Sequence, residues 1–486
     1  MSHYEQGQWE AVIGIETHVQ LLTETKLFCG CSARFGAGPN EHTCPLCLAM
    51  PGVLPVANRL AVDFAIRAAL TLNGEVQPVS RWARKNYFYP DLPKAYQISQ
   101  YEQPYCVGGE LTIDVDGEER RVRLTRIHME EDAGKNIHDA HADYSHVDLN
   151  RAGVPLLEIV SEPDIRSAAE AAAYMRKLRT IVRYLGICDG NMNEGSMRCD
   201  ANVSLRKRGT SVLGTRAEVK NMNSFRAVER AVAYEIERQA ELLNAGEPIV
   251  QETRLWDADR GVTRSMRSKE EAHDYRYFPE PDLLPLEISE EWIEKARREL
   301  PELPDAKRAR FEQQYGLPVY DAGVLTASQD LADYYERAVA VHDNPKAISN
   351  WVMGDVIRVA RDAADEGEPD YGDLPVEAEG LAAMVSLIDD GTISGKMAKT
   401  VFQKMVESGD DPATIVAREG LVQVTDEGEI IALVEKVLGA NQDKVAEYRG
   451  GKEKLLGFFV GQVMKESRGQ ANPQQVNRLL KEKLES

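Results

Sequence analysis

Strict alternation of apolar and polar residues marks several short stretches between residues 12 and 221, and this period of two predicts β-strands with unlike faces. The apolar faces carry aliphatic side chains such as Ile13 and Ile15. The polar faces carry Glu16 and His18 in 12–21, Arg198, Asp200, Asn202, Ser204 and Arg206 in 196–206, and Glu218 and Lys220 in 215–221. A glycine-containing connection joins the last two stretches, which predicts a hairpin.

Two further stretches add carboxylates to the predicted sheet. In 121–135 the alternation is mixed, but His128, Glu130 and Asp132 share a face if the strand continues that far. In 154–164, Glu158 stands inside an apolar run, where an unpaired carboxylate is costly, so we expect it to have a partner. These faces fit a cation-binding polar cavity, because Glu, Asp and His suit Mg²⁺ and proton transfer. An antiparallel sheet with one wet face explains the same alternation without any function.

A period of 3.6 residues predicts two amphipathic helices, over 167–187 and 225–246, that pack one face on the sheet. Ser167 and Glu170 have the spacing of a capping box at the start of the first. Beyond residue 292 the strand signal fades and helical segments follow. We therefore predict an α+β fold: a largely antiparallel sheet with flanking helices in 1–292, an all-helical domain in 293–410 and a small helical tail domain in 411–486.

The composition is that of a globular protein, with 43% hydrophobic and 28% charged residues among 486. No apolar run approaches the ~20 residues of a membrane span, so we expect no membrane partner. The polar, acidic start of the chain lacks the features of a secretory signal, which favours a cytoplasmic location. Thiols stay reduced there, and the seven cysteines, an odd number, also argue against a disulfide framework.

Four of the cysteines fall in two close pairs, Cys29 with Cys31 and Cys44 with Cys47, separated by a loop. Glycines and a proline in this segment allow tight turns, so the four sulfurs can converge on one tetrahedral Zn²⁺. Such a site leaves no position for a substrate water, which makes the zinc structural. The alternative is four small buried hydrophobic side chains.

The net charge of −21, from 58 basic and 79 acidic residues, disfavours indiscriminate binding of polyanions but permits local patches. One candidate patch is the segment 81–104, whose aromatics beside cations suit an unpaired 3′ end of RNA, and the other is the tail. The candidate RNA-binding residues are Arg84, Lys85 and Tyr87 in the first patch and Lys452, Lys454, Lys465 and Arg468 in the second. An aromatic core strand and a solvated basic helix explain the two segments equally well.

Two kinds of motif are missing from the sequence. It has no G-x-x-x-x-G-K-[ST] phosphate loop, so any ATP must be held by another arrangement, such as Mg²⁺ on carboxylates. It also has no Ser-rich amidase motif and no Cys-His glutaminase arrangement, which indicates that the chain does not make its own ammonia.

Long blocks spread over the whole chain resemble the B subunit of the glutamyl/aspartyl-tRNA(Gln/Asn) amidotransferase. They include VIGIETHVQL, ARKNYFYPDLPKAYQISQYEQP, RIHMEEDAGK, EGSMRCDANVS, EVKNMNSFRAVERA and, in the second half, SNWVMGD and GFFVGQVMKESRGQANPQQVN. The resemblance implies a cradle-like α+β catalytic domain, a helical domain and a small helical tail that contacts tRNA.

The resemblance also implies a two-step ligase reaction on mischarged Glu-tRNA(Gln), Asp-tRNA(Asn) or both. ATP phosphorylates the side-chain carboxylate, and ammonia from a partner amidase (glutaminase) subunit displaces the phosphate. The small third subunit of the amidotransferase is a second expected partner, and the cognate non-discriminating aminoacyl-tRNA synthetase is a further candidate. The expected cofactors are ATP, Mg²⁺ and the structural Zn²⁺.

By the same resemblance, the blocks that line the metal and phosphate site contain Glu16, His18, Glu130 and Glu131. The expected magnesium ligands are His18, Glu130 and Glu131. Side-chain direction adds as catalytic candidates Glu158, Asp200, Asn202, Glu218 and Lys220, and as nucleotide-binding candidates Arg198, Ser204 and Arg206. Two other classes stay open: a non-enzymatic, zinc-containing RNA-binding scaffold, and a carboxylate-rich metallohydrolase that acts alone.

Overall fold

The computed structural model describes residue 4 and residues 7–138, 144–268, 272–364, 369, 371–424, 426–467 and 469–485. The chain forms two compact units, Met1–Leu303 and Pro304–Ser486. Within the described residues, every strand belongs to the first unit and the second consists of helices and their connections. The predicted α+β class is therefore confirmed, while the domain limits expected near residues 292 and 410 stay a prediction.

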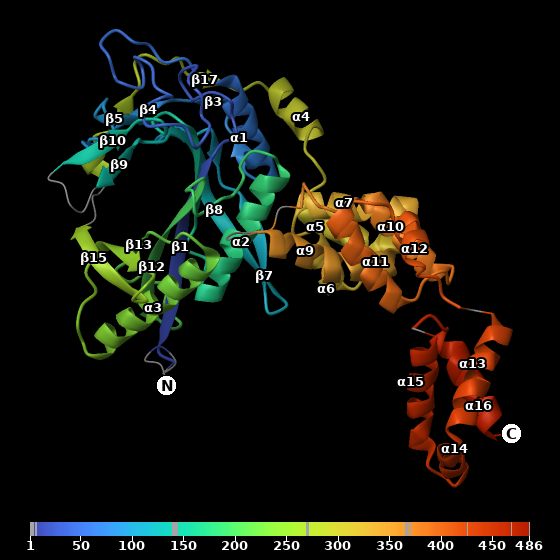
Figure 1. Cartoon of the computed structure of the whole chain (residues 1–486). Helices are drawn as coiled ribbons and strands as arrows, with labels where there is room; N and C mark the ends of the chain where they lie inside the picture. The colour runs from blue at the N-terminus through green and yellow to red at the C-terminus, as the bar shows by residue number, and fades with distance from the viewer. Residues whose placement is uncertain are drawn as a thin grey trace. The chain divides into compact units, whose positions relative to one another are not determined.

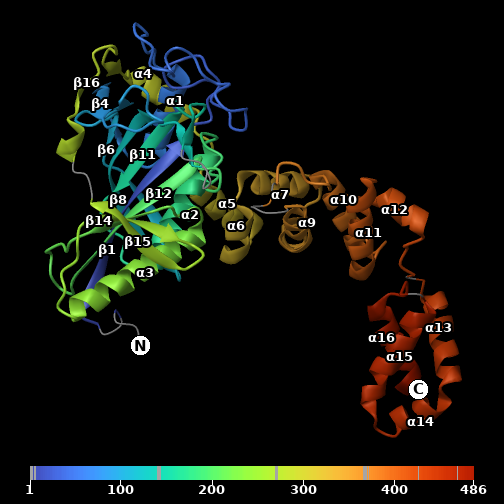
Figure 2. The same ribbon diagram turned by 60° about the vertical axis from the view of Figure 1, so that its left-hand side comes forward.

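A ten-stranded sheet forms the centre of the first unit (Figures 1 and 2). Its strands pair in the order β15-β14-β13-β12-β1-β11-β8-β6-β2, and β7 pairs with the first half of β8. The pairing of β13 with β14 is parallel and the other pairings are antiparallel, so the sheet is largely antiparallel, as the sequence predicted. The strands are β1 (Trp9–Gln20), β2 (Glu75–Val76), β6 (Cys106–Val107), β7 (Glu110–Val115), β8 (Glu118–Glu131), β11 (Pro155–Ser161), β12 (Met197–Lys207), β13 (Ala217–Lys220), β14 (Glu252–Asp257) and β15 (Val262–Ser268).

The apolar face of this sheet packs against two long helices, α2 (Ala168–Tyr184) and α3 (Phe225–Asn244), which run beside β1 and β12 in Figure 1. Ile13 and Ile15 of β1 are fully buried in that core, and the Thr17 hydroxyl donates to Met175 Sδ of α2 at 3.4 Å. Because side chains alternate along a strand, Glu16 points to the opposite face. The hydrophobic core thus covers one face of the sheet, and the polar side chains lie on the other face.

Both helices have a serine at the N-cap, and Ser167 is the one that the sequence analysis indicates for α2. Ser167 Oγ accepts from the backbone N–H of Glu170 at 3.1 Å, and Ser224 Oγ accepts from that of Ala227 at 3.1 Å. The capping box of α2 is incomplete, because the Glu170 carboxylate accepts from the N–H of Arg166 at 2.7 Å. Each cap satisfies an N–H group that the first helical turn leaves unpaired.

Smaller elements complete the first unit. They are the sheets β4 (Ala83–Asn86), β5 (Tyr96–Ser99) and β16 (Phe278–Pro279); β3 (Val79–Ser80) and β17 (Leu286–Glu287); β9 (Lys135–His138) and β10 (Ser145–Asp148); the helices α1 (Arg59–Thr71) and α4 (Glu290–Arg298); and the 3₁₀ turn η2 (Ala272–Tyr275). Trp292 of α4 donates from Nε1 to Asp63 Oδ1 of α1 at 3.1 Å. The contacts of this unit therefore continue into α4.

The second unit has two separate hydrophobic cores among its described residues. The first core is formed by α5 (Pro304–Tyr315), α6 (Val319–Leu325), α7 (Gln329–Val341), α8 (Pro345–Trp351), the π-helical turn η3 (Val352–Val356), α9 (Ile357–Ala363), α10 (Ala378–Asp389), α11 (Gly395–Ser408) and α12 (Pro412–Glu419). The second core is formed by α13 (Glu427–Ala440), α14 (Gln442–Arg449), the 3₁₀ turn η4 (Glu453–Leu455), α15 (Leu456–Glu466) and α16 (Pro473–Glu485). Among the described residues, no helix has the length and apolar character needed to cross a bilayer.

Candidate active site and metal centre

His18, Glu130 and Glu158 form a first group of candidate metal ligands on the polar face of the sheet. The strand register sets Glu158 of β11 opposite His18 of β1 on one side and His128 of β8 on the other. A Glu158 carboxylate oxygen lies 3.5 Å from His18 Nε2 and 3.4 Å from His128 Nε2. Glu130 lies 3.6 Å from His128 Nε2 and accepts from the Ser99 hydroxyl at 3.1 Å. One ligand atom each from His18, Glu130 and Glu158 lies within 4.8 Å of the others, close enough to share a divalent cation.

Burial and neighbouring charges shift the pKa values of this group in opposite directions. Burial lowers the pKa of His128, but Glu158 and Glu130 outweigh it and raise the pKa to about 9. Burial likewise lowers the pKa of His18, and its contact with Glu158 raises it above the ordinary value. Burial raises the pKa of both carboxyl groups, yet His128 and its neighbours hold the pKa of Glu130 and of Glu158 below the ordinary range. Both carboxylates are therefore ionised at neutral pH, as cation binding requires.

Glu16, Asp200 and Glu218 form a second group whose ligand atoms lie within 4.8 Å of one another. The register sets Glu16 opposite Asp200 and Asn202 opposite Glu218. Asn202 Nδ2 donates to Glu16 Oε1 at 3.0 Å, and Lys220 forms an ion pair with Asp200. Burial lowers the pKa of Lys220, but Asp200 and Glu218 raise it above its ordinary value. Carboxylates gathered at this spacing offer the oxygen ligands that a divalent cation prefers.

A cavity of about 580 Å³ opens beside both groups. Its charged and polar lining includes His18, Lys85, Tyr87, Glu130, Asp132, Arg198, Asp200 and Lys220. Lys85 Nζ lies 5.0 Å from the ring centre of Tyr275 and 5.9 Å from that of Tyr87. Burial lowers the pKa of Lys85, but Glu130 and other neighbours raise it well above its ordinary value. The cavity thus brings ammonium and guanidinium groups beside carboxylates, which is the charge pattern of a metal and phosphate site.

The Glu131 side chain does not lie beside that of Glu130, although both belong to the magnesium ligand set expected from the sequence. Neighbouring residues of a strand point to opposite faces, so the Glu131 side chain leaves the polar face. It accepts from the Ile98 N–H at 2.9 Å and forms an ion pair with Lys94. Glu158 instead completes the group with His18 and Glu130.

Of the three candidate nucleotide-binding residues, Arg198 alone is among the described residues that line the cavity. Ser204 lies four residues beyond Asp200 on β12, about 13 Å along the strand. Its hydroxyl donates to a main-chain carbonyl of β1 at 3.2 Å. Arg206 donates to Glu10 Oε2 at 2.6 Å. The side chains of Ser204 and Arg206 therefore make hydrogen bonds within the sheet and lie away from the two groups of candidate ligands.

The candidate RNA-binding residues of the aromatic segment have different surroundings. Lys85 and Tyr87 line the cavity. Arg84 makes two hydrogen bonds to the Glu280 carboxylate, at 2.7 and 2.9 Å, and its guanidinium lies 4.1 Å from the ring centre of Tyr96. An arginine that is hydrogen-bonded to a buried carboxylate stabilises the local structure. This structural role explains Arg84 better than RNA binding does.

The candidate RNA-binding residues of the tail are exposed where the structure describes them, and these are Lys452, Lys454 and Lys465. Lys452 pairs with Glu447 at 3.0 Å, and an exposed pair of this kind contributes little to stability. Arg468 lies outside the described residues. The lysines are therefore accessible to a polyanion.

Asp132 is a part of the cavity wall to which the sequence assigned no role. Asp132 accepts from Gln20 Nε2 at 2.7 Å and from Arg198 Nη2 at 2.9 Å. Burial raises the pKa of Asp132, but Arg198 and the other donors lower it below its ordinary range. The sequence signal that could have identified Asp132 was the strand face that it shares with Glu130. In the structure, the Asp132 carboxylate orients the Arg198 guanidinium.

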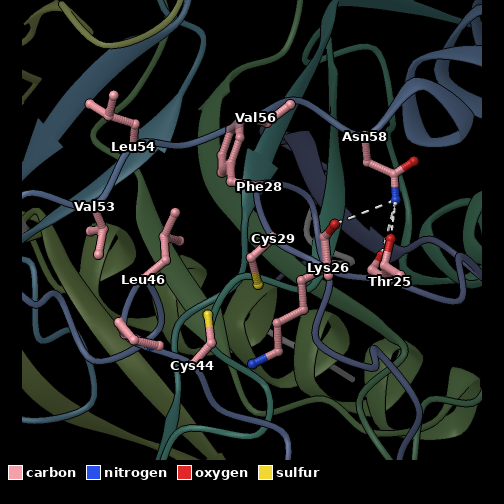
Figure 3. A pocket seen from close by; sticks show the side chains of 12 residues that line it. Thr25, Lys26, Phe28, Cys29, Cys44, Leu46, Val53, Leu54, Val56 and Asn58 are labelled. Carbon is pink, nitrogen blue, oxygen red and sulfur yellow. Dashed lines mark hydrogen bonds between the residues drawn. The ribbon is translucent and has the colours of Figure 1, made fainter.

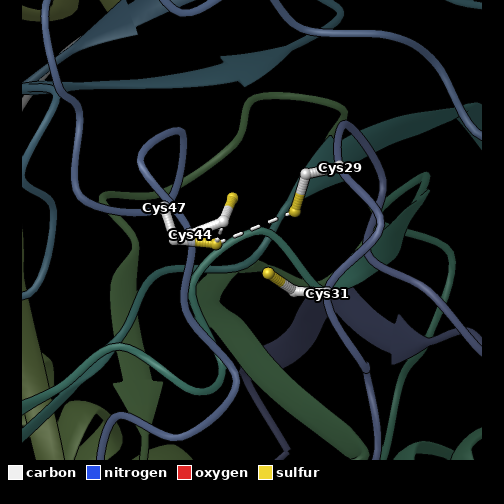
Figure 4. Close-up of side chains that lie close together, drawn as sticks. All are labelled: Cys29, Cys31, Cys44 and Cys47. Carbon is white, nitrogen blue, oxygen red and sulfur yellow. Dashed lines mark hydrogen bonds between the residues drawn. The ribbon is translucent and has the colours of Figure 1, made fainter.

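The four paired cysteines converge on one point (Figure 4). Their sulfurs lie within 4.8 Å of one another, and Cys47 Sγ is 3.8 Å from both Cys29 Sγ and Cys44 Sγ. Four sulfurs at ~2.3 Å from one tetrahedral zinc are about 3.8 Å apart, so the arrangement fits Zn²⁺. The contact with Cys29 lowers the pKa of the Cys47 thiol to about 4, and Lys26 adds to that effect. The same contact and burial raise the pKa of Cys29, and burial raises that of Cys31 to about 11, so Cys47 is the sulfur that favours the thiolate form.

Beside the cysteines lies an open pocket of about 650 Å³ with a largely apolar wall (Figure 3). Its apolar side chains are Phe28, Leu46, Val53, Leu54 and Val56. At its edge, Asn58 accepts from the Leu60 N–H at 2.9 Å and so caps α1. The same side chain donates to Thr25 Oγ1 at 3.0 Å, which ties the cysteine segment to the helix.

The chain matches known proteins over nearly its whole length. A family model described as the GatB/GatE catalytic domain matches residues 11–294, and one described as the GatB domain matches residues 333–484. The B subunit of the aspartyl/glutamyl-tRNA(Asn/Gln) amidotransferase of Geotalea daltonii is 60% identical over 481 residues, 98% of this chain and 100% of that protein. Proteins of the same name from Geobacter sulfurreducens and Carboxydothermus hydrogenoformans are 59% and 57% identical, each over 98% of this chain and 99% of its own length. The chain therefore belongs to the family of B subunits of the aspartyl/glutamyl-tRNA(Asn/Gln) amidotransferase.

Proposed function

We propose that this chain activates and amidates the mischarged amino acid in a tRNA-dependent amidotransferase. ATP phosphorylates the side-chain carboxylate of Glu on tRNA(Gln), of Asp on tRNA(Asn), or of both, and ammonia then displaces the phosphate. The observation that carries the proposal is the pair of ligand groups beside one cavity, the first with His18 and the second with Asp200. Family membership suggests the reaction, and the cavity offers a place for it.

The residues of the cavity suit this chemistry. A carboxylate is a poor electrophile, and phosphorylation turns one of its oxygens into a leaving group. Mg²⁺ held by the two ligand groups would offset the charge of the phosphates. Lys85 and Lys220 line the same cavity and would bind anionic oxygens of ATP or of the substrate. Asp132 would keep the Arg198 guanidinium turned toward them.

The cysteine cluster has a separate role in the proposal. Its four sulfur donors would hold a structural zinc and leave no position for a reacting water. The metal would fold the segment 29–47 onto the catalytic unit. Its removal should loosen that unit more than it alters the chemical step.

The proposed enzyme is a complex of several different chains. Ammonia would come from a partner amidase (glutaminase) subunit in the cytoplasm, and a small third subunit would complete the complex. The tail, roughly 423–486, would hold tRNA(Gln) or tRNA(Asn) through exposed cations such as Lys454 and Lys465. The non-discriminating synthetase that makes the mischarged tRNA would be a further partner.

Reconstitution tests the proposal. The chain is mixed with the amidase and the small third subunit, and Glu-tRNA(Gln) and Asp-tRNA(Asn) are assayed separately with ATP and glutamine. Amidation should require the chain and ATP, and His18→Ala should nearly abolish it while the amidase still hydrolyses glutamine. No ATP consumption with either tRNA would favour a scaffold. Full hydrolytic activity without a partner would favour a lone metallohydrolase.

A further inference from the structure

Lys26 is a buried lysine at the edge of the cysteine segment. The residue is 1% exposed, and Figure 3 shows its side chain pointing to the side of the pocket where the cysteines lie. Its ammonium donates to the main-chain oxygens of His42 at 2.7 Å and Leu149 at 3.1 Å. It also lies 3.3 Å from Cys47 Sγ. All three N–H groups of the ammonium thus have a partner.

The charge of this ammonium has one evident counterpart. Within the parts of the chain that the structure describes, no ion pair joins Lys26 to a carboxylate. A buried cation is costly unless a negative charge lies close to it. The two main-chain oxygens are neutral, so the Cys47 sulfur is the contact that can carry a charge. A zinc ion with four thiolates has a formal charge of about −2, which a neighbouring cation would partly offset.

Lys26 also joins the cysteine segment to the wall of the active-site cavity. Leu149 precedes β11, and in the same connection the Gly153 oxygen accepts from the Leu27 N–H at 2.8 Å. A Cβ atom at Gly153 would lie 3.5 Å from Lys26 Cδ, so the lysine stem packs along this glycine. The Gly153 N–H donates to the main-chain oxygen of Asp132 at 2.8 Å, and Asp132 lines the cavity.

We propose that Lys26 is a positioning residue of the metal centre, and this rests on the structural zinc of the proposed function. Its ammonium offsets the negative charge of the metal–thiolate cluster through Cys47 and fastens the cluster to the connection that precedes β11. Lys26 is not among the described residues that line the active-site cavity, so its role is not a catalytic one. A neutral side chain could replace its hydrogen bonds to the carbonyls, but only a cation can offset the charge.

Three variants of the full-length chain test this role. Lys26→Gln keeps donors for the main-chain oxygens and removes the charge, whereas Lys26→Arg keeps the charge. Arg34→Gln removes an exposed cation of the same segment and is the matched control. The measurement is zinc content and the rate at which zinc passes to a chromophoric chelator. We expect transfer about 10- to 100-fold faster for Lys26→Gln, the usual effect of losing a residue that contacts a metal ligand, and near wild-type rates for the other two.

A second measurement uses the unchanged chain and therefore does not depend on how the variants fold. Brief acetylation followed by peptide mass spectrometry compares Lys26 with exposed Lys135, before and after zinc removal. Zinc removal should raise the acetylation of Lys26 about tenfold and leave Lys135 unchanged. Equal zinc transfer from Lys26→Gln and wild type, or equal protection of Lys26 with and without zinc, would overturn the role of Lys26 alone. Wild-type protein without zinc would overturn the structural zinc site as well.

Discussion

Replacing Glu130 by Gln tests the active site most directly, because it removes one negative charge and keeps the shape of the side chain. Glu130 is 2% exposed and belongs to the ligand group of His18 and Glu158. The amide can still accept from the Ser99 hydroxyl, which now bonds the carboxylate at 3.1 Å. The substitution therefore changes the charge of the group and little else.

The expected loss follows from the geometry. The ligand atoms lie within 4.8 Å of one another, so a cation among them would be close to the Glu130 carboxylate. Two unit charges about 4 Å apart interact by about 4 kcal/mol at an effective dielectric constant of ~20. If the transition state needs that interaction, kcat falls by about a thousandfold. Stability should change by less than ~1 kcal/mol, because the repulsion between Glu130 and Glu158 also disappears.

The assay is ATP-dependent amidation by the reconstituted complex at saturating tRNA, together with thermal unfolding of the chain. Glu119→Gln makes the same chemical change at an exposed position of the same strand, and it should alter neither quantity. Glu131→Gln should instead lower stability by about 3 kcal/mol, because it leaves Lys94 without its buried partner. Near-normal phosphorylation of Glu-tRNA(Gln) by Glu130→Gln would refute the placement of the cavity, even though the family would be unchanged.

Three more predictions concern other parts of the chain. Cys44→Ser should remove zinc and loosen the catalytic unit, since structural zinc ions contribute ~10–16 kcal/mol to local folding. Metal analysis and thermal unfolding check this, and wild-type protein without zinc would contradict it. Deleting residues 423–486 should raise KM for tRNA and flatten its salt dependence while kcat at saturating tRNA stays similar, so an unchanged KM would count against a tRNA-binding tail. Glu235→Ala should destabilise the first unit by about 3–5 kcal/mol, because this fully buried carboxylate accepts hydrogen bonds from Arg238 at 2.6 Å and Gln239 at 2.8 Å. Calorimetry checks this, and a loss of unfolding free energy below ~1 kcal/mol would show that the network does not stabilise the unit.

The sequence by itself determined the features that depend on local spacing. Alternation placed Glu16 and His18 on one face of β1 because a strand has a side-chain period of two. The Ser167 cap located the start of α2, since capping involves only neighbouring backbone groups. The spacing of Cys29 and Cys44 from their paired cysteines brought four sulfurs within reach of one another, as a short loop can do without the rest of the fold. The same local logic correctly predicted a partner for Glu158.

Only the tertiary structure decided which polar residues meet. Strand register places Glu158 between two imidazoles contributed by different strands, and no local pattern encodes that pairing. The family resemblance grouped Glu131 with Glu130, yet adjacent residues of a strand point their side chains to opposite faces. Lys26 contacts Leu149, more than a hundred residues away, so its contacts depend on how the cysteine segment folds against the connection that precedes β11. The physical reason is the same in each case: periodicity fixes the direction of a side chain relative to its own backbone, whereas its partners are fixed by the long-range packing of elements.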